Sequence, residues 1–308
     1  MSVDVKKMIN EKKSNRLLLR FNEKAAPAVF IICAIISVLT TLGIVITLSV
    51  ETLTFFSRVS FIDFLTGTEW WPFGENPSYG ILPLISGTLL ITGIAMIVSI
   101  PTGIASAIYL SEFASDNIRK VVKPILEVLA GIPTIVYGFF ALTFVTPVLQ
   151  QFISSLPIFN ALSPGIVVGI MIIPMIASLS EDAMNSVPNA MREGALAMGA
   201  TKLEVAMKIV VPAALSGIIS SFVLGISRAI GETMIVSVAA GSTPKLTMNV
   251  TDSIQTMTGY IVQVSLGDAS YGSTTYYSIY AVGMTLFVFT LCMNLLSQYI
   301  SRRFKEDY

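Results

Sequence analysis

The stretch that decides the fold is Glu193-Gly194-Ala195, followed after three residues by Gly199 and after nine more by Ile209-Val210-Val211-Pro212. It is a polar, charged segment in a chain of 308 residues, of which 54% are hydrophobic and only 12% charged. Soluble domains carry about 25% charged residues, so this composition predicts a polytopic membrane protein. The segment is then a polar loop between membrane helices, unless it is an ordinary helical hairpin whose spacing is incidental.

Local signals divide this loop into two short helices joined at Gly199. Ser186 is expected to cap the first helix, with Pro188 as an early helical residue that needs no N–H partner. Gly199 can end that helix in the left-handed conformation. Thr201-Lys202-Leu203-Glu204 has the pattern of a capping box that starts the second helix, which Pro212 interrupts or ends.

The residue types that the sequence lacks exclude several functions. There is no histidine, which removes histidine-based acid–base relays, histidine metal sites and haem ligation. Cys33 and Cys292 both lie in apolar runs, which predicts small core residues rather than a disulfide framework or a thiolate metal site. No G-x-x-x-x-G-K phosphate loop occurs, so the chain itself is not a P-loop ATPase. We therefore expect no enzyme activity, metal or cofactor in this chain. If the chain works in an ATP-driven process, a separate subunit must bind the ATP and Mg²⁺.

Six apolar runs are long enough to span a membrane, which takes about 20 residues of helix. The first run is too long for the apolar core of a signal peptide and has no small-residue cleavage site, which predicts a retained span. The expected fold is all-α, with six transmembrane helices. They are predicted at residues 27–50, 81–110 (divided at Pro101), 124–149, 163–179, 217–240 and 276–300.

Lysine and arginine are distributed unevenly between the two sides of such a bundle. With residues 1–26 inside, 16 of them fall on the cytoplasmic side and 2 fall outside, while Arg228 lies within a span. By the positive-inside rule, both termini are expected in the cytoplasm. The predicted organisation is a basic tail (1–26), a first membrane helix (27–50), an outer aromatic-rich loop (51–80), a membrane core (81–300) with a cytoplasmic loop at 185–212, and a C-terminal tail (301–308).

Two of the predicted outer segments are long enough to have structure of their own. Residues 51–80 contain eight aromatic side chains, which indicate either an interfacial aromatic belt or a docking surface for an external partner. Residues 241–275 include a weakly amphipathic piece at 254–266, which favours a lid or a short re-entrant helix over a pathway.

Arg228 and Glu232 are two charges inside the fifth predicted span. At 1.5 Å per residue, Arg228 lies roughly 16 Å from the start of that helix, near the middle of the bilayer. Charged side chains at this depth are costly and face a bundle interior or a wet cavity. In a continuous helix the i,i+4 spacing puts both on one face, so we predict an ion pair between them.

This predicted pair has two interpretations. It either fixes helix packing only, or it contacts an anion in transit, because a guanidinium matches the oxygens of phosphate. In the second case Glu232 would accept a hydrogen bond from protonated phosphate. Sulfate has no such proton, so the same carboxylate would repel it.

The loop resembles the EAA loop of binding-protein-dependent ABC importer permeases, whose pattern is E-A-A, three residues, G, nine residues and I-x-L-P. Gly194 replaces the first alanine of that pattern and Val211 replaces its leucine. From about residue 80 to residue 300 the chain is also similar to the PstC family, one of the two permease subunits of bacterial phosphate importers. The similar segments are G-I-L-P-L-I-S-G-T-L at 80–89, I-Y-L-S-E at 108–112, G-I-P-T-I-V-Y-G at 131–138 and R-A-I-G-E-T at 228–233.

This resemblance implies a type I ABC importer permease fold (MetI-like) in a bacterial cytoplasmic membrane. It implies that Arg228 and Glu232 lie on the path of inorganic phosphate. The implied assembly is a heterodimer with a PstA-like permease subunit, two PstB-like ATPase subunits and a periplasmic PstS-like phosphate-binding protein, surrounded by membrane lipid and without nucleic acid. The loop residues implied to couple to an ATPase are Glu193, Gly194, Ala195, Gly199, Ile209 and Pro212.

Other functions stay open from the residues. A related permease would carry another oxyanion, such as sulfate or molybdate. A secondary carrier or channel would use Arg228 and Glu232 as a proton- or anion-coupled site. A membrane scaffold or sensor would need no translocation at all.

Overall fold

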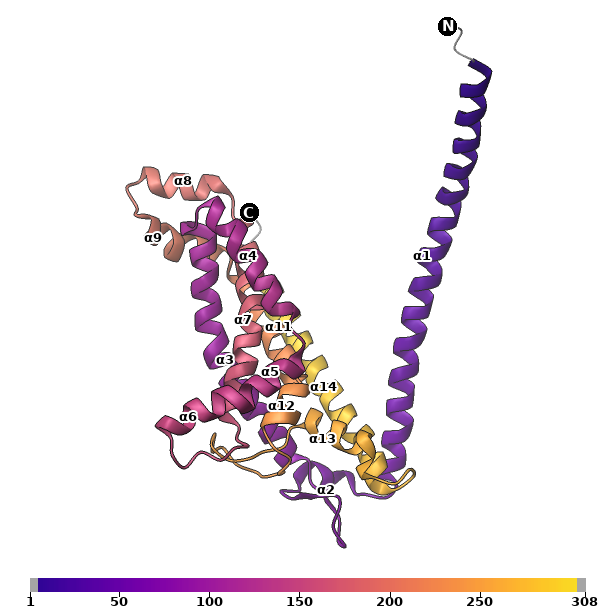
Figure 1. Ribbon diagram of the computed structural model, residues 1–308, viewed down its shortest axis with the longest axis vertical. Helices are drawn as coiled ribbons and strands as arrows, with labels where there is room; N and C mark the ends of the chain where they lie inside the picture. Colours follow the sequence, from indigo (N-terminus) through magenta and orange to yellow (C-terminus); the bar gives the residue numbers. More distant parts are fainter. Residues whose placement is uncertain (1–4, 304–308) are drawn as a thin grey trace. The chain divides into compact units, whose positions relative to one another are not determined.

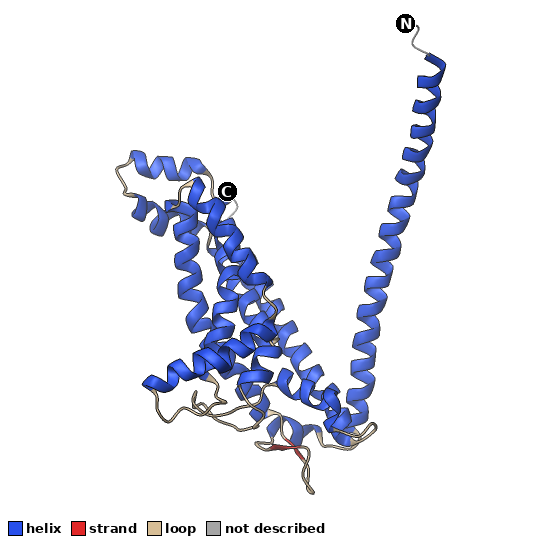
Figure 2. Cartoon of the chain, in the orientation of Figure 1, coloured by secondary structure: helices blue, strands red, loops and turns tan. Residues whose placement is uncertain are grey.

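The computed structural model describes the backbone of residues 5–303 and the side chains of residues 26–299, except those of Asp268 and Ser297. The chain divides into two units, Met1–Glu51 and Thr52–Tyr308, and each is described by itself. Helices make up nearly all of the regular structure (Figures 1 and 2). The first unit is helical, and the helix α1 (Val5–Phe56) contains the apolar stretch Ala26–Phe56 that includes the predicted first span.

The second unit is a helical bundle with a small antiparallel hairpin, in which Trp70 pairs with Tyr79 and Trp71 with Ser78. Its elements are α2 (Phe61–Thr66), β1 (Trp70–Trp71), β2 (Ser78–Tyr79), α3 (Leu82–Ile108), the π-helical turn η1 (Tyr109–Phe113), α4 (Asp116–Gly131), α5 (Thr134–Phe140), η2 (Ala141–Val145), α6 (Thr146–Phe152), α7 (Leu162–Asn185), α8 (Asn189–Ala197), α9 (Lys202–Val205), η3 (Ala206–Val210), α10 (Val211–Ala213), α11 (Leu215–Ile230), α12 (Met234–Ala239), α13 (Met257–Gln263), η4 (Val264–Asp268) and α14 (Thr274–Arg303).

The two ends of this bundle differ in character. The helices α8 and α9 lie at one end, which we call the loop end, and α2, the hairpin and α13 lie at the other, which we call the hairpin end (Figure 1). The helices α3, α7, α11 and α14 run between the two ends.

Five helices in the described part of the chain are long and apolar enough to cross a membrane. A sixth results if α9 to α10 and α11, which meet at an angle of 71°, are counted as one bent span. The prediction of a polytopic helical membrane protein is thus confirmed, with five or six spans. The five are Ala26–Phe56, Leu82–Phe113, Thr134–Phe152, Leu162–Asn185 and Thr274–Leu296.

The third predicted span, 124–149, is wrong at its start. The helix breaks at Ile132, whose backbone is extended (φ −65°, ψ 129°), and the membrane-length helix begins at Thr134. Pro133 is the cause, because a proline disfavours helical geometry in the residue before it. The preceding helix α4 is separate and packs beside α7.

The fifth predicted span, 217–240, is also not one helix. The helix α11 ends at Ile230, and a second helix, α12, begins at Met234. This break separates the two charged residues of the predicted ion pair, with consequences described below.

The core of the bundle is the close contact between α3 and α7, where only glycine fits. A Cβ at Gly165 would lie 2.8 Å from the Ile94 side chain, and one at Gly169 would lie 2.9 Å from the carbonyl oxygen of Ala95. These glycines are four residues apart and therefore share one face of α7. Small residues at this spacing let membrane helices approach closely, so that dispersion contacts can hold them together.

The aromatic-rich segment forms a core at the hairpin end, a role that neither interpretation of it included. Phe55, Phe64 and Trp70 are almost completely buried, and Trp70 meets the ring of Tyr260 edge to face with centroids 4.8 Å apart. Such aromatic pairs stabilise a fold beyond their buried area. Trp71 and other aromatics of this segment stay exposed. The segment thus joins its own hairpin to α13.

The amphipathic piece at 254–266 does contain a short helix, α13, whose Met257 and Tyr260 are buried. The backbone N–H of Met257 donates to Thr88 Oγ1 of α3, and the hydroxyl of Tyr260 lies 2.6 Å from that of Ser278. The helix is therefore packed into the hairpin end.

Candidate functional site

The polar loop folds as two short helices joined by a glycine turn. The N–H of Gly199 donates to the carbonyl of Leu196, the N–H of Ala200 donates to that of Ala195, and Gly199 has a φ of +89°. This is the Schellman arrangement, in which the left-handed residue lets the chain satisfy the last carbonyls of a helix. The predicted role of Gly199 is confirmed.

The second helix of the loop begins with the predicted capping box. Thr201 Oγ1 accepts from the N–H of Glu204, and the Glu204 carboxylate accepts from the N–H of Thr201. The helix then widens into the π-turn η3 and ends at Ala213, one residue after Pro212, as predicted.

The predicted cap of the first loop helix is wrong. Ser186 ends the preceding helix α7, where its hydroxyl donates to the carbonyl of Ala183, and Pro188 occupies the cap position of α8. Ser186 lies in the short connection between α7 and α8, so its side chain can bind the last carbonyls of α7 or the first amides of α8.

The outer face of the loop is exposed and mixes charge with apolar side chains. Glu193 is exposed, and no ion pair or hydrogen bond of its carboxylate occurs within the described residues. Met198 is 89% exposed, and Leu203 and Met207 are at least half exposed. A shallow groove lined by Ala195, Gly199 and Ile209, among others, lies between the two helices. We call the exposed residues Glu193, Met198, Leu203 and Met207, together with this groove, the docking face.

The inner side of the loop is fixed by an arginine that the sequence analysis did not single out. The side chain of Arg192 lies 3.0 Å from Glu112 Oε1 through Nη2, and it donates to the carbonyls of Val187 and Met184 at 2.6 and 2.7 Å. Both charged side chains are mostly buried, at 16% and 10% exposure. Arg192 and Glu112 are 80 residues apart, so no local pattern could have paired them.

A second group of charges ties α4 to α7 at the loop end. Glu181, which is fully buried, lies 3.1 Å from Lys123 Nζ and 3.5 Å from Arg119 Nε. Burial lowers the pKa of Lys123, but its hydrogen bonds and charge interactions with Glu181 and Asp182 together raise that pKa above its usual value. The ammonium is therefore charged at neutral pH. Glu181 and Lys123 are 58 positions apart in the sequence, so only the fold brings them together.

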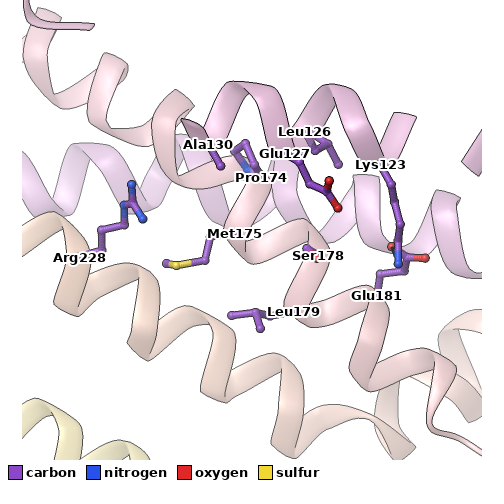
Figure 3. Close-up of a pocket in the computed structure, with 10 residues that line it drawn as sticks. All are labelled: Lys123, Leu126, Glu127, Ala130, Pro174, Met175, Ser178, Leu179, Glu181 and Arg228. Carbon is purple, nitrogen blue, oxygen red and sulfur yellow. Dashed lines mark ion pairs between the residues drawn. The ribbon is translucent and has the colours of Figure 1, made fainter. Parts of the chain in front are cut away.

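Arg228 points into a pocket of about 390 Å³ between α4, α7 and α11 (Figure 3). The pocket is also lined by Glu127, Ser178, Glu181 and Lys123. Within the described residues, the guanidinium makes no ion pair or hydrogen bond. The rest of the lining is apolar and includes Leu126, Met175 and Leu179. Arg228 is exposed in this chain, so the five N–H donors of its guanidinium are available to a partner or ligand from outside the chain.

The predicted ion pair between Arg228 and Glu232 does not form in this structure. Glu232 Oε1 instead accepts from the N–H groups of Met234 and Ile235, at 3.0 and 3.2 Å, and the side chain is 7% exposed. The i,i+4 argument assumed a continuous helix, but the helix ends at Ile230 and Glu232 caps the next one. The first amides of a helix have no acceptor within that helix, so the Glu232 carboxylate provides one at this largely buried site.

The fold and this geometry define a class: a multi-pass helical membrane subunit with an exposed helix pair at one end and an arginine-lined pocket among its helices. Residues 99–306 match the family described as the inner membrane component of binding-protein-dependent transport systems. The match covers more than half of the chain, so the chain belongs to this family of ABC importer permeases.

Individual relatives agree with this family. A probable ABC transporter permease protein, YqgH, of Bacillus subtilis (strain 168) is 38% identical over 275 residues, 89% of either chain. The phosphate transport system permease protein PstC of Xylella fastidiosa (strain 9a5c) is 33% identical over 258 residues, 77% of this chain and 78% of that one.

Solved structures confirm the MetI-like fold. A bacterial ABC transporter involved in the import of the acidic polysaccharide alginate matches with a TM-score of 0.65 at 19% identity, over 94% of this chain and all of that one. The MetNI methionine ABC transporter matches with a TM-score of 0.55 at 17% identity, over 74% of this chain and 95% of that one. At these identities the likeness concerns the fold alone.

Proposed function

We propose that this chain is a permease subunit of a phosphate importer and forms, with a second, PstA-like permease subunit, the path for inorganic phosphate across the cytoplasmic membrane. The observation that carries this proposal is Arg228, an exposed residue that lines a pocket among the helices and makes no ion pair or hydrogen bond within the described residues. A guanidinium binds phosphate oxygens through two parallel hydrogen bonds. Relatives named as phosphate transport permeases support the choice of this anion.

The docking face supports an ATPase as the partner at the loop end. Glu193 offers a carboxylate that has no partner in the described part of the chain, and Met198 and Leu203 offer exposed apolar side chains. An exposed apolar surface rimmed by charge is typical of a protein interface. Two PstB-like ATPases, which bind ATP and Mg²⁺, would supply the energy, and a PstS-like protein would deliver phosphate from the periplasm, with both termini of this chain in the cytoplasm.

Glu232 has a structural role in this proposal. Its carboxylate accepts hydrogen bonds from the amides of Met234 and Ile235 and so stabilises the break between α11 and α12. This break ends α11 and thereby fixes the position of Arg228. This assignment replaces the hydrogen bond to protonated phosphate that the sequence suggested.

The test is radiolabelled phosphate uptake by the complete transporter in proteoliposomes. We expect Arg228→Gln to assemble normally and to lose at least 99% of the uptake, and Glu193→Lys to co-purify with less ATPase. Normal uptake by both variants would refute the proposal. Competition by sulfate and molybdate tests the related oxyanion permeases, and uptake by the permease subunits alone in an ion gradient would instead establish a secondary carrier.

A further inference from the structure

Arg192 joins three elements through one guanidinium. It belongs to α8, it pairs with Glu112 in the π-turn η1 that follows α3, and it donates to the carbonyls of Val187 and Met184 at the end of α7. A planar fork with five donors is suited to such a junction, because it fixes the direction of every partner. A displacement of α8 therefore acts directly on the ends of α3 and α7.

The junction continues as a chain of polar contacts. The hydroxyl of Ser111 lies 2.8 Å from Glu112 Oε1 and 3.2 Å from Asn185 Oδ1. Asn185 Nδ2 in turn donates to Glu181 Oε1 at 3.3 Å. Because the hydroxyl has one proton and two acceptors, it can donate to either side of this link but not fully to both.

The chain of contacts reaches the pocket that contains Arg228. Glu181 is paired with Lys123, and both of these residues line that pocket (Figure 3). The succession Arg192, Glu112, Ser111, Asn185, Glu181 and Lys123 thus runs from the helix that bears the docking face to the pocket. Glu181 is fully buried and the Glu112–Arg192 pair is mostly buried, whereas the link between Ser111 and Asn185 is exposed. Solvent therefore screens the charge interactions little at the two ends of the chain of contacts.

We propose that Glu112 and Arg192 are positioning residues that transmit the movement of α8 through this chain of contacts. They would thereby fix the position of the Lys123–Glu181 pair in the pocket that contains Arg228. This inference rests on the proposed function, because it assigns a task to the side of α8 that faces away from the ATPase. Residues that merely held α8 in place would affect assembly. Residues that transmit its movement affect how much phosphate is carried for each ATP hydrolysed.

The experiment measures the ratio of phosphate uptake to ATP hydrolysis for the complete transporter in proteoliposomes, together with co-purification of the ATPase. We expect Glu112→Gln and Arg192→Gln to lower this ratio at least tenfold with the ATPase still bound. The double variant should be no worse than either single variant, because residues in one network are not additive. Ser111→Ala breaks the link without leaving a buried charge unpaired, and it should lower the ratio several-fold in a stable protein.

The control is Lys245→Gln, which removes an exposed 2.7 Å ion pair with Asp252 outside the loop and the chain of contacts, and should leave the ratio unchanged. The inference is overturned if Ser111→Ala and both single variants keep the wild-type ratio, if the losses of the single variants multiply in the double variant, or if the ratio falls only as ATPase is lost from the complex. In each of these outcomes the proposed function stands as long as the wild-type complex imports phosphate with ATP and Arg228→Gln does not.

Discussion

Replacing Glu232 tests whether its carboxylate serves the backbone or the transported anion. In the structure its Oε1 accepts from the amides of Met234 and Ile235 at a site that is 7% exposed. Ala cannot accept these bonds, whereas Gln keeps an oxygen at nearly the same place. The two substitutions therefore separate the loss of an acceptor from the loss of a charge.

The expected magnitudes follow from these two bonds. Leaving a buried donor unpaired costs about 1–3 kcal/mol, so Glu232→Ala is expected to lose about 2–4 kcal/mol for two amides that share one acceptor. Hydrogen bonds to a charged acceptor are roughly twice as strong as neutral ones, so Glu232→Gln is expected to lose about 1 kcal/mol. At about 2–4 °C per kcal/mol for a unit of this size, the unfolding midpoint should fall by about 4–16 °C for Ala and about 2–4 °C for Gln.

The assay is thermal unfolding in detergent, followed by the fluorescence of Trp70 and Trp71, in parallel with phosphate uptake. We expect Glu232→Gln to keep uptake and to exclude sulfate as the wild-type protein does. Two results would refute this reasoning: equal midpoints for the Ala and Gln variants, or a Gln variant of unchanged stability that has begun to carry sulfate. The second result would restore the direct contact with protonated phosphate.

Three further predictions concern the α3–α7 contact, the turn between α8 and α9, and the segment between α12 and α13. Gly169→Ala places a Cβ 2.8 Å from the Val98 side chain and should cost about 1–3 kcal/mol in the unfolding assay, whereas Gly93→Ala, with no atom within 4 Å, should be neutral or better. Gly199→Ala forces a φ of +89° on a residue with a side chain, which should cost about 1–2 kcal/mol and speed proteolysis between α8 and α9. The control Gly194→Ala adds a side chain in open space within α8 and should slow that proteolysis. Equal proteolysis rates for the two variants would contradict the assigned turn. The hydrogen bond from Lys245, together with one from Thr247, lowers the pKa of Asp252 below its usual value. The ionised Asp252 carboxylate therefore contributes its full stability above about pH 4, and this contribution is lost as the pH falls through the lower, folded-state pKa. Asp252→Asn should therefore flatten the fall of the unfolding midpoint below about pH 4, and an unchanged fall would contradict this role.

Several features that depend on neighbours in the sequence could be predicted, although the cap at Ser186 was not, and features that depend on distant residues could not. The turn at Gly199 and the capping box of Thr201 and Glu204 are local, and both are confirmed. The break before Pro133 was also readable, because the proline alone disfavours the helical geometry that the predicted span required. The pairing of Arg192 with Glu112 and the packing of Trp70 on Tyr260 join residues that only the fold brings together.

The predicted pair of Arg228 and Glu232 shows a different limit. Both residues could be singled out from the sequence, because charged side chains are conspicuous in an apolar segment. Their contact was wrong because it depended on the backbone between them. Gly231 and the Glu232 carboxylate together supply an alternative to the helix, which spacing alone does not reveal.

The break at residues 231–233 also has an electrostatic consequence. Arg228 lies in the last turn of α11, where the backbone dipoles leave partial negative charge, and Glu232 lies at the start of α12, where they leave partial positive charge. Each side chain is thus balanced by a helix end rather than by the other side chain, which leaves the guanidinium available to a visiting anion. Exchanging the two residues would place both charges at helix ends of their own sign, so an exchange that a simple ion pair tolerates should fail here.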